Sequence, residues 1–411
     1  MQLKTKLQKY IYWFTFLAIN FLSLLFKIRK LNFVEYKYDQ QFAFNVLSSC
    51  QNGEIFNYIQ NSAGVPAGPL IYLYECVGGL VGISNYQSLL IFEILISQLL
   101  LIFLFYSLKN YLNPYSNLLV FLAICLNPFL VLWTRNPGIT AHFELFAVLF
   151  VYYYLNRNKK KSNYFFIGFL SSLSFAAYIP IFVISYSILF TLLLFRKINN
   201  LKLLIYGSLS GFLLSIMAFI PYYQNAPFEV PRSRSGSWGL SSYWRILIDV
   251  LSGRSIKTKI NNPEDYELLN QNFSQFDFFV NLNYVLILLI LSYALIHLFK
   301  NLYKNQINDL DILFIGSLII SGIIFTVLDV PLYAHYLLTL SIFIFIYSFN
   351  AIIRNSILFL IFIVLMFSNI YINFSFHEFI QVNSGAENSD YGKSYTTCGC
   401  CVEDARGCRG Q

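Results

Sequence analysis

Charged residues are scarce in this sequence. Asp, Glu, Lys and Arg make up 12% of the 411 residues, whereas a soluble globular domain carries roughly 25%. So few charges cannot solvate the surface of a water-soluble protein of this length. Long apolar runs, such as residues 284–299 and 356–372, require lipid as their solvent. The scarcity of charge therefore excludes a soluble globular fold and predicts a polytopic membrane protein.

Strict alternation of apolar and polar residues is also missing. Strands of a membrane β-barrel alternate, whereas these runs are almost continuously apolar, so the predicted fold class is all-α. The first run, residues 10–26, is long for the apolar part of a signal peptide and no small-x-small cleavage site follows it. We interpret it as a retained first span. The net charge of +8 is interpreted as a signal of orientation rather than of nucleic-acid binding.

Basic clusters orient the predicted spans. Arg157–Lys161, Arg196–Lys202, Lys300–Lys304 and Arg354 fall between alternate pairs of apolar segments. Placing these clusters in the cytoplasm gives a multi-pass inner-membrane protein of about 11 transmembrane helices with a cytoplasmic amino terminus. This register requires that residues 69–83 do not cross, and about 15 residues is short of the roughly 20 that a span needs. We interpret them as half-inserted, with a short tilted span as the alternative.

The topology divides the chain into six regions. The outer segments include a first loop with helices lying along the membrane interface and a carboxy-terminal tail with four of the seven cysteines. These cysteines can pair on an oxidising side, and their spacing matches no zinc site. The regions are the first span (1–27), the first extracytoplasmic loop (28–85), the second to seventh spans (86–221), a large extracytoplasmic loop (222–276), the last four spans (277–373) and the Cys-rich extracytoplasmic tail (374–411).

Asp39 is the first candidate for chemistry. It lies in the polar stretch from Glu35 to Asn45, directly after the first span, and it is followed by Gln40. A loop aspartate is usually a solvated or helix-capping residue. Asp39 opens a predicted helix, however, and the amino terminus of a helix favours a negative charge. A carboxylate held there, at the mouth of an apolar bundle, is suited to proton transfer.

Arg135, His142 and Glu144 crowd the next short outer turn. Arg135 has the alternative role of an interfacial anchor. Glu144 falls inside an apolar helix, where an acid is costly and usually faces the bundle interior or an aqueous cavity. His142 and Glu144 are two residues apart and do not share a helix face, so we prefer Glu144 as the residue that shares a site with Asp39.

Other polar residues near the outer face are weaker candidates. His335 opens a late span, where it can be satisfied inside the bundle or contact a phosphate or sugar hydroxyl. Arg232 and Arg234 in the large loop can bind a phosphate through a guanidinium fork. Glu75 and Glu93 are functional suspects because of their depth in the membrane, but no partner for them is evident in the sequence.

These segments, taken together in their order, resemble the GT-C glycosyltransferases, membrane enzymes that use polyprenyl-phosphate sugars, such as the aminoarabinose and protein O-mannosyl transferases. Two departures are clear: the family often has Asp-Glu where this chain has Asp39-Gln40, and its late Pro-Arg-Tyr element here lacks the arginine. The segments that carry the resemblance are Tyr38-Asp39-Gln40, Gly68-Pro-Leu-Ile-Tyr-Leu-Tyr74, Asn127-Pro128 with Trp133-Thr-Arg135, Pro331-Leu-Tyr-Ala-His-Tyr336 and Asp390-Tyr-Gly-Lys-Ser-Tyr395.

The resemblance implies a GT-C-like helical bundle that transfers a sugar, with inversion, from a polyprenyl-phosphate donor to a glycan, lipid or protein acceptor on the extracytoplasmic face. Asp39 would be the general base, and Glu144 would hold either the acceptor or a divalent metal. The arginines would neutralise the leaving phosphate, and Gln40, His142 and His335 would contact the substrate. The alternatives are a flippase or transporter of a lipid-linked saccharide and an O-antigen polymerase.

Overall fold

The computed structural model describes residues 2–31, 38–53, 70, 73–136, 143–224, 240–259, 263–327, 333–353 and 355–382. Every regular element within these ranges is a helix, and they contain no strand. The prediction of an all-α fold is therefore confirmed for this part of the chain. Outside it lie several expected features, among them His142, Arg232, Arg234 and the tail cysteines.

The helices of the first half are α1 (Gln2–Ile28), α2 (Tyr38–Gln51), α3 (Leu73–Leu80), α4 (Tyr86–Leu108), α5 (Pro114–Leu126), α6 (Pro128–Trp133), α7 (Phe143–Asn156), α8 (Ser162–Ala177), α9 (Ile179–Leu194) and α10 (Leu201–Gln224). Those of the second half are α11 (Leu240–Leu251), η1 (Arg254–Lys259), α12 (Pro263–Asn272), α13 (Phe276–Tyr303), α14 (Asp309–Phe314), η2 (Ile315–Ile320), α15 (Ser321–Val327), η3 (Ala334–Leu337), α16 (Leu338–Ile352) and α17 (Ser356–Val382).

Seven helical stretches are long and apolar enough to cross a membrane, which indicates a multi-pass membrane protein. Three shorter apolar helices, α5, α7 and α9, accompany them. Length and composition thus identify seven spans among the described residues, and the larger number expected from the basic clusters stays a prediction. The seven stretches are Gln8–Ile28, Tyr86–Leu108, Leu201–Ile220, Phe276–Tyr303, Asp309–Val327, Ala334–Ile352 and Ser356–Ile380.

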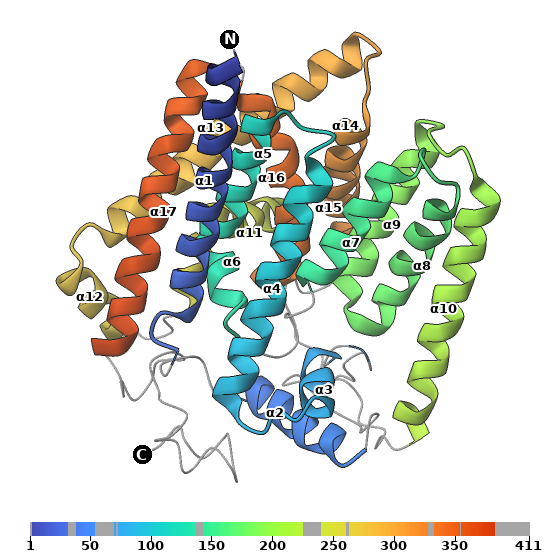
Figure 1. The fold of residues 1–411 in the computed structure, drawn as a ribbon, viewed down its shortest axis with the longest axis horizontal. Helices are drawn as coiled ribbons and strands as arrows, with labels where there is room; N and C mark the ends of the chain where they lie inside the picture. The colour runs from blue at the N-terminus through green and yellow to red at the C-terminus, as the bar shows by residue number, and fades with distance from the viewer. Residues whose placement is uncertain are drawn as a thin grey trace.

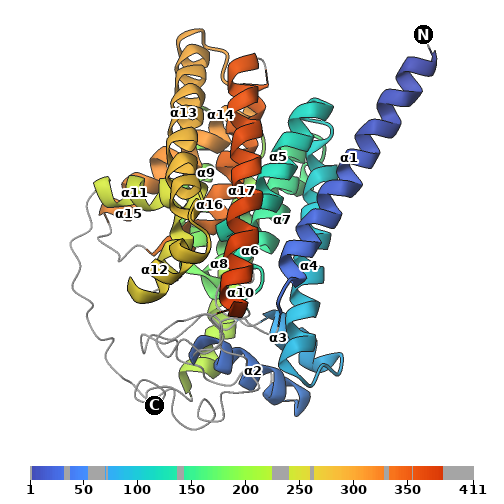
Figure 2. The same cartoon turned by 90° about the vertical axis from the view of Figure 1, so that its left-hand side faces the viewer.

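The bundle has two distinct ends. Loops that follow α4, α7, α9 and α13 meet at one of them, which we call the basic end. There Lys159 lies 4.9 Å from the ring of Tyr111, and Asn199 Nδ2 donates to Asn158 Oδ1 at 2.9 Å. Arg157 forms a salt bridge with Asp309, which follows the loop after α13. The amino terminus lies at this end, and α1 runs from it to the opposite end, where α2 and α3 lie (Figures 1 and 2). We call the latter the cap end.

The short helices α2 and α3 form a cap that is tied together covalently. A disulfide joins Cys50 of α2 to Cys76 of α3, with their Cα atoms 5.2 Å apart. Gly79 of α3 packs so closely on the backbone of α2 that a Cβ atom there would meet the Leu47 carbonyl. With only eight residues, α3 is about 12 Å long and cannot cross a hydrocarbon core of roughly 30 Å.

Helix α10 packs almost solely on α8, through a seam of glycines. Gly207 and Gly211 bring α10 against the backbone carbonyls of Phe165 and Phe169, so a Cβ atom at either glycine would collide with α8. Such seams let helices approach closely in lipid, where close van der Waals packing drives association. Much of the remaining surface of α10 is exposed and apolar, which is the surface that lipid chains would cover.

Candidate functional site

Polar residues line the contact between α1 and α4, although both helices are otherwise apolar. Asn20, Ser23 and Lys27 lie on one face of α1 because they are spaced four residues apart or nearly so. Gln98 donates to Asn20 Oδ1 at 2.7 Å and accepts a hydrogen bond from Ser23 at 3.2 Å. Lys27 Nζ donates to Ser97 Oγ at 2.8 Å. A polar seam therefore leads along α1 toward the cap end.

Glu144 lies at the end of this seam. It is in the first turn of α7, where its charge suits the helix amino terminus. Glu144 and Lys27 are both almost completely buried, with exposed fractions of 2% and 1%. The Glu144 carboxyl lies near Ser97 and close enough to the Lys27 ammonium to interact with it electrostatically. The buried acid that the sequence singled out therefore has a buried cation of the first helix in its surroundings.

Two further glutamates lie near Glu144 and Lys27. Glu75 of α3 and Glu93 of α4 are 0% and 4% exposed, and they are close enough to interact electrostatically. Burial, followed by the negative charges of Glu144, Glu93 and Glu75, raises the pKa of the Tyr74 hydroxyl well above its usual range. Among the described residues, Glu93 Oε1 is buried without a hydrogen-bond partner.

Arg135 follows α6, and a break in the helix sets its position. Asn127 ends α5 and caps α6, because its Oδ1 accepts from the backbone N–H groups of Phe129 and Leu130 at 3.0 Å each. Its Nδ2 donates to the Leu251 carbonyl at 2.8 Å and so fastens the break to α11. Arg135 itself is 3% exposed and donates from Nη2 to the Lys30 carbonyl at 3.2 Å.

The last turn of α1 therefore connects the two predicted outer-turn residues. Lys27 contacts the surroundings of Glu144, and Lys30, three residues later, contacts Arg135. Lys30 has a left-handed backbone (φ 55°), a conformation that commonly ends a helix with a tight turn. Glu144 and Arg135 thus lie at the same end of the bundle, and their membership of one functional site stays a prediction.

His335 lies in a group of aromatic rings. Its ring centroid is 5.2 Å from Trp133, 5.6 Å from Tyr333 and 4.7 Å from Tyr336. Tyr178, at the start of α9, completes the group at 5.7 Å from Tyr336. Because Trp133 is two residues before Arg135, the group adjoins the cap end, and its half-buried rings offer flat apolar faces with polar edges.

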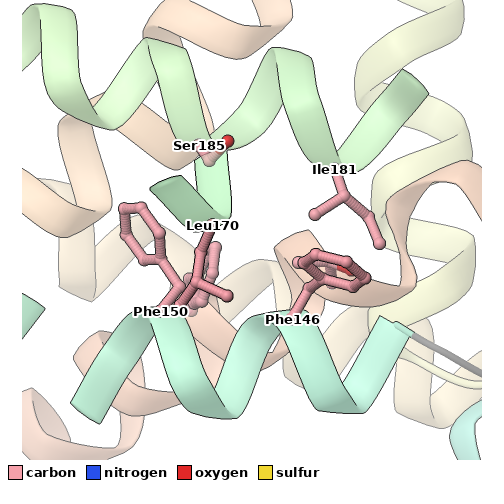
Figure 3. Close-up of a pocket in the computed structure, with 7 residues that line it drawn as sticks. Phe146, Phe150, Leu170, Ile181 and Ser185 are labelled. Carbon is pink, nitrogen blue, oxygen red and sulfur yellow. The ribbon is translucent and has the colours of Figure 1, made fainter. Parts of the chain in front are cut away.

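A small apolar pocket lies deeper in the bundle, between α7, α8, α9 and α16. Phe146 and Phe150 face Ile181 and Ser185 across it, with Leu170 between them (Figure 3). The pocket begins two residues beyond Glu144 in sequence, but its lining carries no charged group. Apolar cavities of this kind stay dry, so it suits hydrocarbon rather than a sugar.

Several expected site residues have side chains outside the described part of the structure. Asp39 and Gln40 belong to the first turn of α2 at the cap end, but their side-chain positions are not described. His142, Arg232 and Arg234 lie in segments that are not described at all. Their proposed roles stay predictions, and so does a metal at Glu144. Among the described residues, no group of three or more His, Cys, Asp or Glu side chains is arranged to hold a metal ion.

The structure also adds residues that the sequence did not reveal. The sequence showed Lys27 only as the basic flank of a span, whereas in the structure it is buried, donates to Ser97 and attracts the charge of Glu144. A signal existed, because opposite charges within apolar stretches commonly pair. Cys50 and Cys76 gave a weaker signal, since both belong to the same predicted outer loop. His377, buried near the end of α17, gave none.

No protein-family model, curated protein or solved structure matches the chain.

Proposed function

We propose that this protein is an integral-membrane glycosyltransferase that moves a sugar from a polyprenyl-phosphate donor to an acceptor on the extracytoplasmic face. The observation that carries the proposal is the placement of Glu144 and Arg135, which come from different helices and are both buried against the last turn of α1. Buried charges within membrane-length helices are expensive and usually functional. The helix that begins with Tyr38 and Asp39 lies at the same end.

The proposed reaction is a single inverting displacement. The acceptor hydroxyl loses its proton to the Asp39 carboxylate, and its oxygen forms a new bond to the anomeric carbon of the donor sugar. The bond between that carbon and the phosphate oxygen breaks, and the phosphate leaves with the electron pair. Arg135 neutralises the negative charge that develops on the leaving group. Arg232 and Arg234 stay candidates for the same task.

Glu144 has a positioning role in this proposal. Its carboxyl group lies near Ser97 and is attracted by the Lys27 ammonium, and its burial restricts its orientation before substrate arrives. A fixed carboxylate can accept hydrogen bonds from acceptor hydroxyls and hold the attacking one in line. The rings around His335 adjoin the same region and provide apolar faces for a sugar.

Two features support the proposed orientation. The loops of the basic end carry the clusters that would lie in the cytoplasm. The cap end carries the Cys50–Cys76 disulfide, a bond that persists in oxidising compartments outside the cytoplasm. The basic residues at the end of α1 weigh little against this assignment, because Arg29 forms a salt bridge with Glu378 and Lys27 is buried, where it donates to Ser97. The eleven-span topology is part of the same proposal.

Mass spectrometry of surface glycans and lipids tests the function. Cells lacking the gene should lose one sugar modification, and the wild-type chain should restore it, whereas Asp39→Ala and Glu144→Gln should not. Lys109→Gln, which removes a cation at the basic end, is the matched control and should restore it fully. Full restoration by Asp39→Ala would remove Asp39 from the catalytic role.

The donor distinguishes an enzyme from a transporter. If the chain transfers sugar, the knockout should accumulate the lipid-linked sugar on the outer leaflet, where an impermeant lectin or oxidant detects it. If the chain instead moves the lipid-linked sugar across the membrane, the same pool should be trapped on the inner leaflet, and the transferase proposal would fail.

A further inference from the structure

A second polar group lies at the cap end, between the ends of α1, α6 and α17. Arg29, directly after α1, contacts Glu378 of α17 in a salt bridge and lies 4.5 Å above the ring of Phe374. Lys30 Nζ is 3.9 Å from the same Glu378 carboxylate. Arg135 joins the group through its bond to the Lys30 carbonyl. Cationic side chains from the turns that follow α1 and α6 therefore converge here.

His377 faces these cations from α17. It is 1% exposed, its ring lies 6.3 Å from that of Phe26, and its charged neighbours are Arg135 and Arg29. Its Nδ1 is buried and has no hydrogen-bond partner among the described residues. A buried polar atom left without a partner costs about 1–3 kcal/mol, so an imidazole in this position calls for an explanation.

We propose that Arg29, Arg135 and His377 form an oxyanion site that binds a phosphate group, with His377 donating a hydrogen bond from Nδ1. A phosphate oxygen would give Nδ1 the acceptor that it lacks. The guanidinium groups present N–H donors in a fork that matches phosphate geometry, and Arg29 would bind the phosphate while keeping its salt bridge to Glu378. Arg135 and His377 are almost completely buried, which strengthens their hydrogen bonds to an anion.

The inference rests on the proposed function only in its choice of ligand, a phosphate carried on a lipid. The site faces the end of a bundle whose helices are coated with apolar side chains, so a lipid phosphate can reach it from the membrane plane. Arg135 is shared with the proposed reaction, and Arg29 and His377 are new. His377 then contacts the phosphate and is a binding residue, not a general base.

Binding of a polyprenyl phosphate to the purified full-length chain, measured by native mass spectrometry from detergent, tests the proposal directly. We expect Arg135→Gln to weaken binding roughly 10- to 100-fold and His377→Phe about 5- to 10-fold, as for the loss of charge-assisted hydrogen bonds. His377→Asn keeps an N–H donor near the position of Nδ1 and should retain most of the affinity. Lys109→Gln, at the basic end, should bind like the wild type.

Equal affinity of the wild type and His377→Phe, with both monodisperse and melting at the same temperature, would overturn the proposal. So would equally tight binding of the uncharged polyprenol, because the phosphate would then make no contribution. If His377→Phe does not fold, loss of binding in His377→Gln with retention in His377→Asn gives the same decision.

Further ligands distinguish the source of the phosphate. Competition by inorganic phosphate would support a site that binds the phosphate alone. Binding of phosphatidylglycerol that equals polyprenyl phosphate and depends on His377 would support the oxyanion site and weigh against a dedicated sugar-donor lipid. Conversely, His377-dependent binding together with an unchanged glycan profile in the knockout would keep the site and refute the glycosyltransferase.

Discussion

The two ends of the bundle differ in how many hydrogen bonds they provide to a buried carboxyl group. At the basic end, Asp311 is fully buried and accepts hydrogen bonds from Tyr347 at 2.8 Å, Asn301 at 2.9 Å and the Asn308 backbone at 2.8 Å. At the cap end, Glu93 is 4% exposed, and its Oε1 has no hydrogen-bond partner among the described residues. The hydrogen-bonding capacity of Asp311 is thus satisfied within the fold, whereas that of Glu93 is not.

The difference supports our proposal that ligand binds at the cap end. A satisfied polar network rigidifies a fold, whereas a partly satisfied one stores a cost that binding can relieve. Asp311 completes a capping box at the start of α14 and ties α13 to α16, so its role is structural. The partial networks around Glu93 and His377 lie at the cap end, where we propose that the substrate binds.

The largest expected effect is at the Lys27–Glu144 pair. Lys27→Met removes the cation that attracts the buried Glu144 carboxyl group and the donor of the hydrogen bond to Ser97. Loss of a hydrogen bond to a charged group alone costs about 1.5–3 kcal/mol, and the lost attraction adds to it. We expect Lys27→Met to unfold at markedly lower denaturant in mixed micelles. The double variant Lys27→Met/Glu144→Gln should recover most of the loss, because no buried charge is left over. Additive effects of the two changes would show that the residues are not coupled.

A matched pair of neutral substitutions tests the comparison itself. Asp311→Asn loses at least one charge-assisted hydrogen bond and should destabilise the chain by about 1.5–3 kcal/mol, with normal activity in the protein that folds. Glu93→Gln replaces the carboxyl group beside Glu75 with a neutral amide of similar shape and should leave stability within about 1 kcal/mol of the wild type, while lowering the glycan product. The opposite pattern would reverse the roles that we assign to the two ends.

The disulfide of the cap should have a local effect. Its loop spans 26 residues, for which a closed loop contributes roughly 3 kcal/mol. We expect Cys50→Ser to loosen α2 against α3 without lowering the main melting transition. A membrane-impermeant maleimide added to intact cells should then label Cys76 in the variant but not in the wild type. Labelling only after the cells are lysed would place the cap in the cytoplasm.

The smallest expected effect is a pH dependence at Tyr74. Its raised folded-state pKa means that the neutral hydroxyl stabilises the fold fully below the unfolded value of about 10, and that this contribution is lost as the pH rises toward the folded-state pKa. Melting temperatures of the wild type and Tyr74→Phe should therefore run parallel from pH 7 to 9. Above pH 10, the wild type should lose stability faster, and parallel curves there would contradict the assignment.

The sequence predicted the all-α fold because apolar runs of membrane length dominate it. It also identified Glu144 and Arg135, since a charge in an apolar stretch is conspicuous and seldom idle. Glu75 and Glu93 were recognised without partners, because helix packing, not sequence spacing, brings α3 and α4 to α7.

The sequence did not indicate that Lys27 and His377 are buried at the cap end, for a different reason. A lysine at the end of a span usually extends to the interface, and its burial depends on the position of Ser97 and Glu144 on other helices. His377 follows an ordinary apolar pattern, so its environment is set by α1 and α6. The pairing of Cys50 with Cys76 likewise depends on how α2 and α3 cross.

The glycine seam between α8 and α10 bears on the order in which the chain is assembled during synthesis. Among the described elements, helix α10 has almost no contact with any helix other than α8. Only α9 lies between these two helices in the chain. The pair can therefore form as soon as both helices leave the insertion machinery, before α13 exists. A bulky residue at Gly207 should release α10 into the lipid, where it becomes accessible to quality-control proteases while the remaining helices stay together.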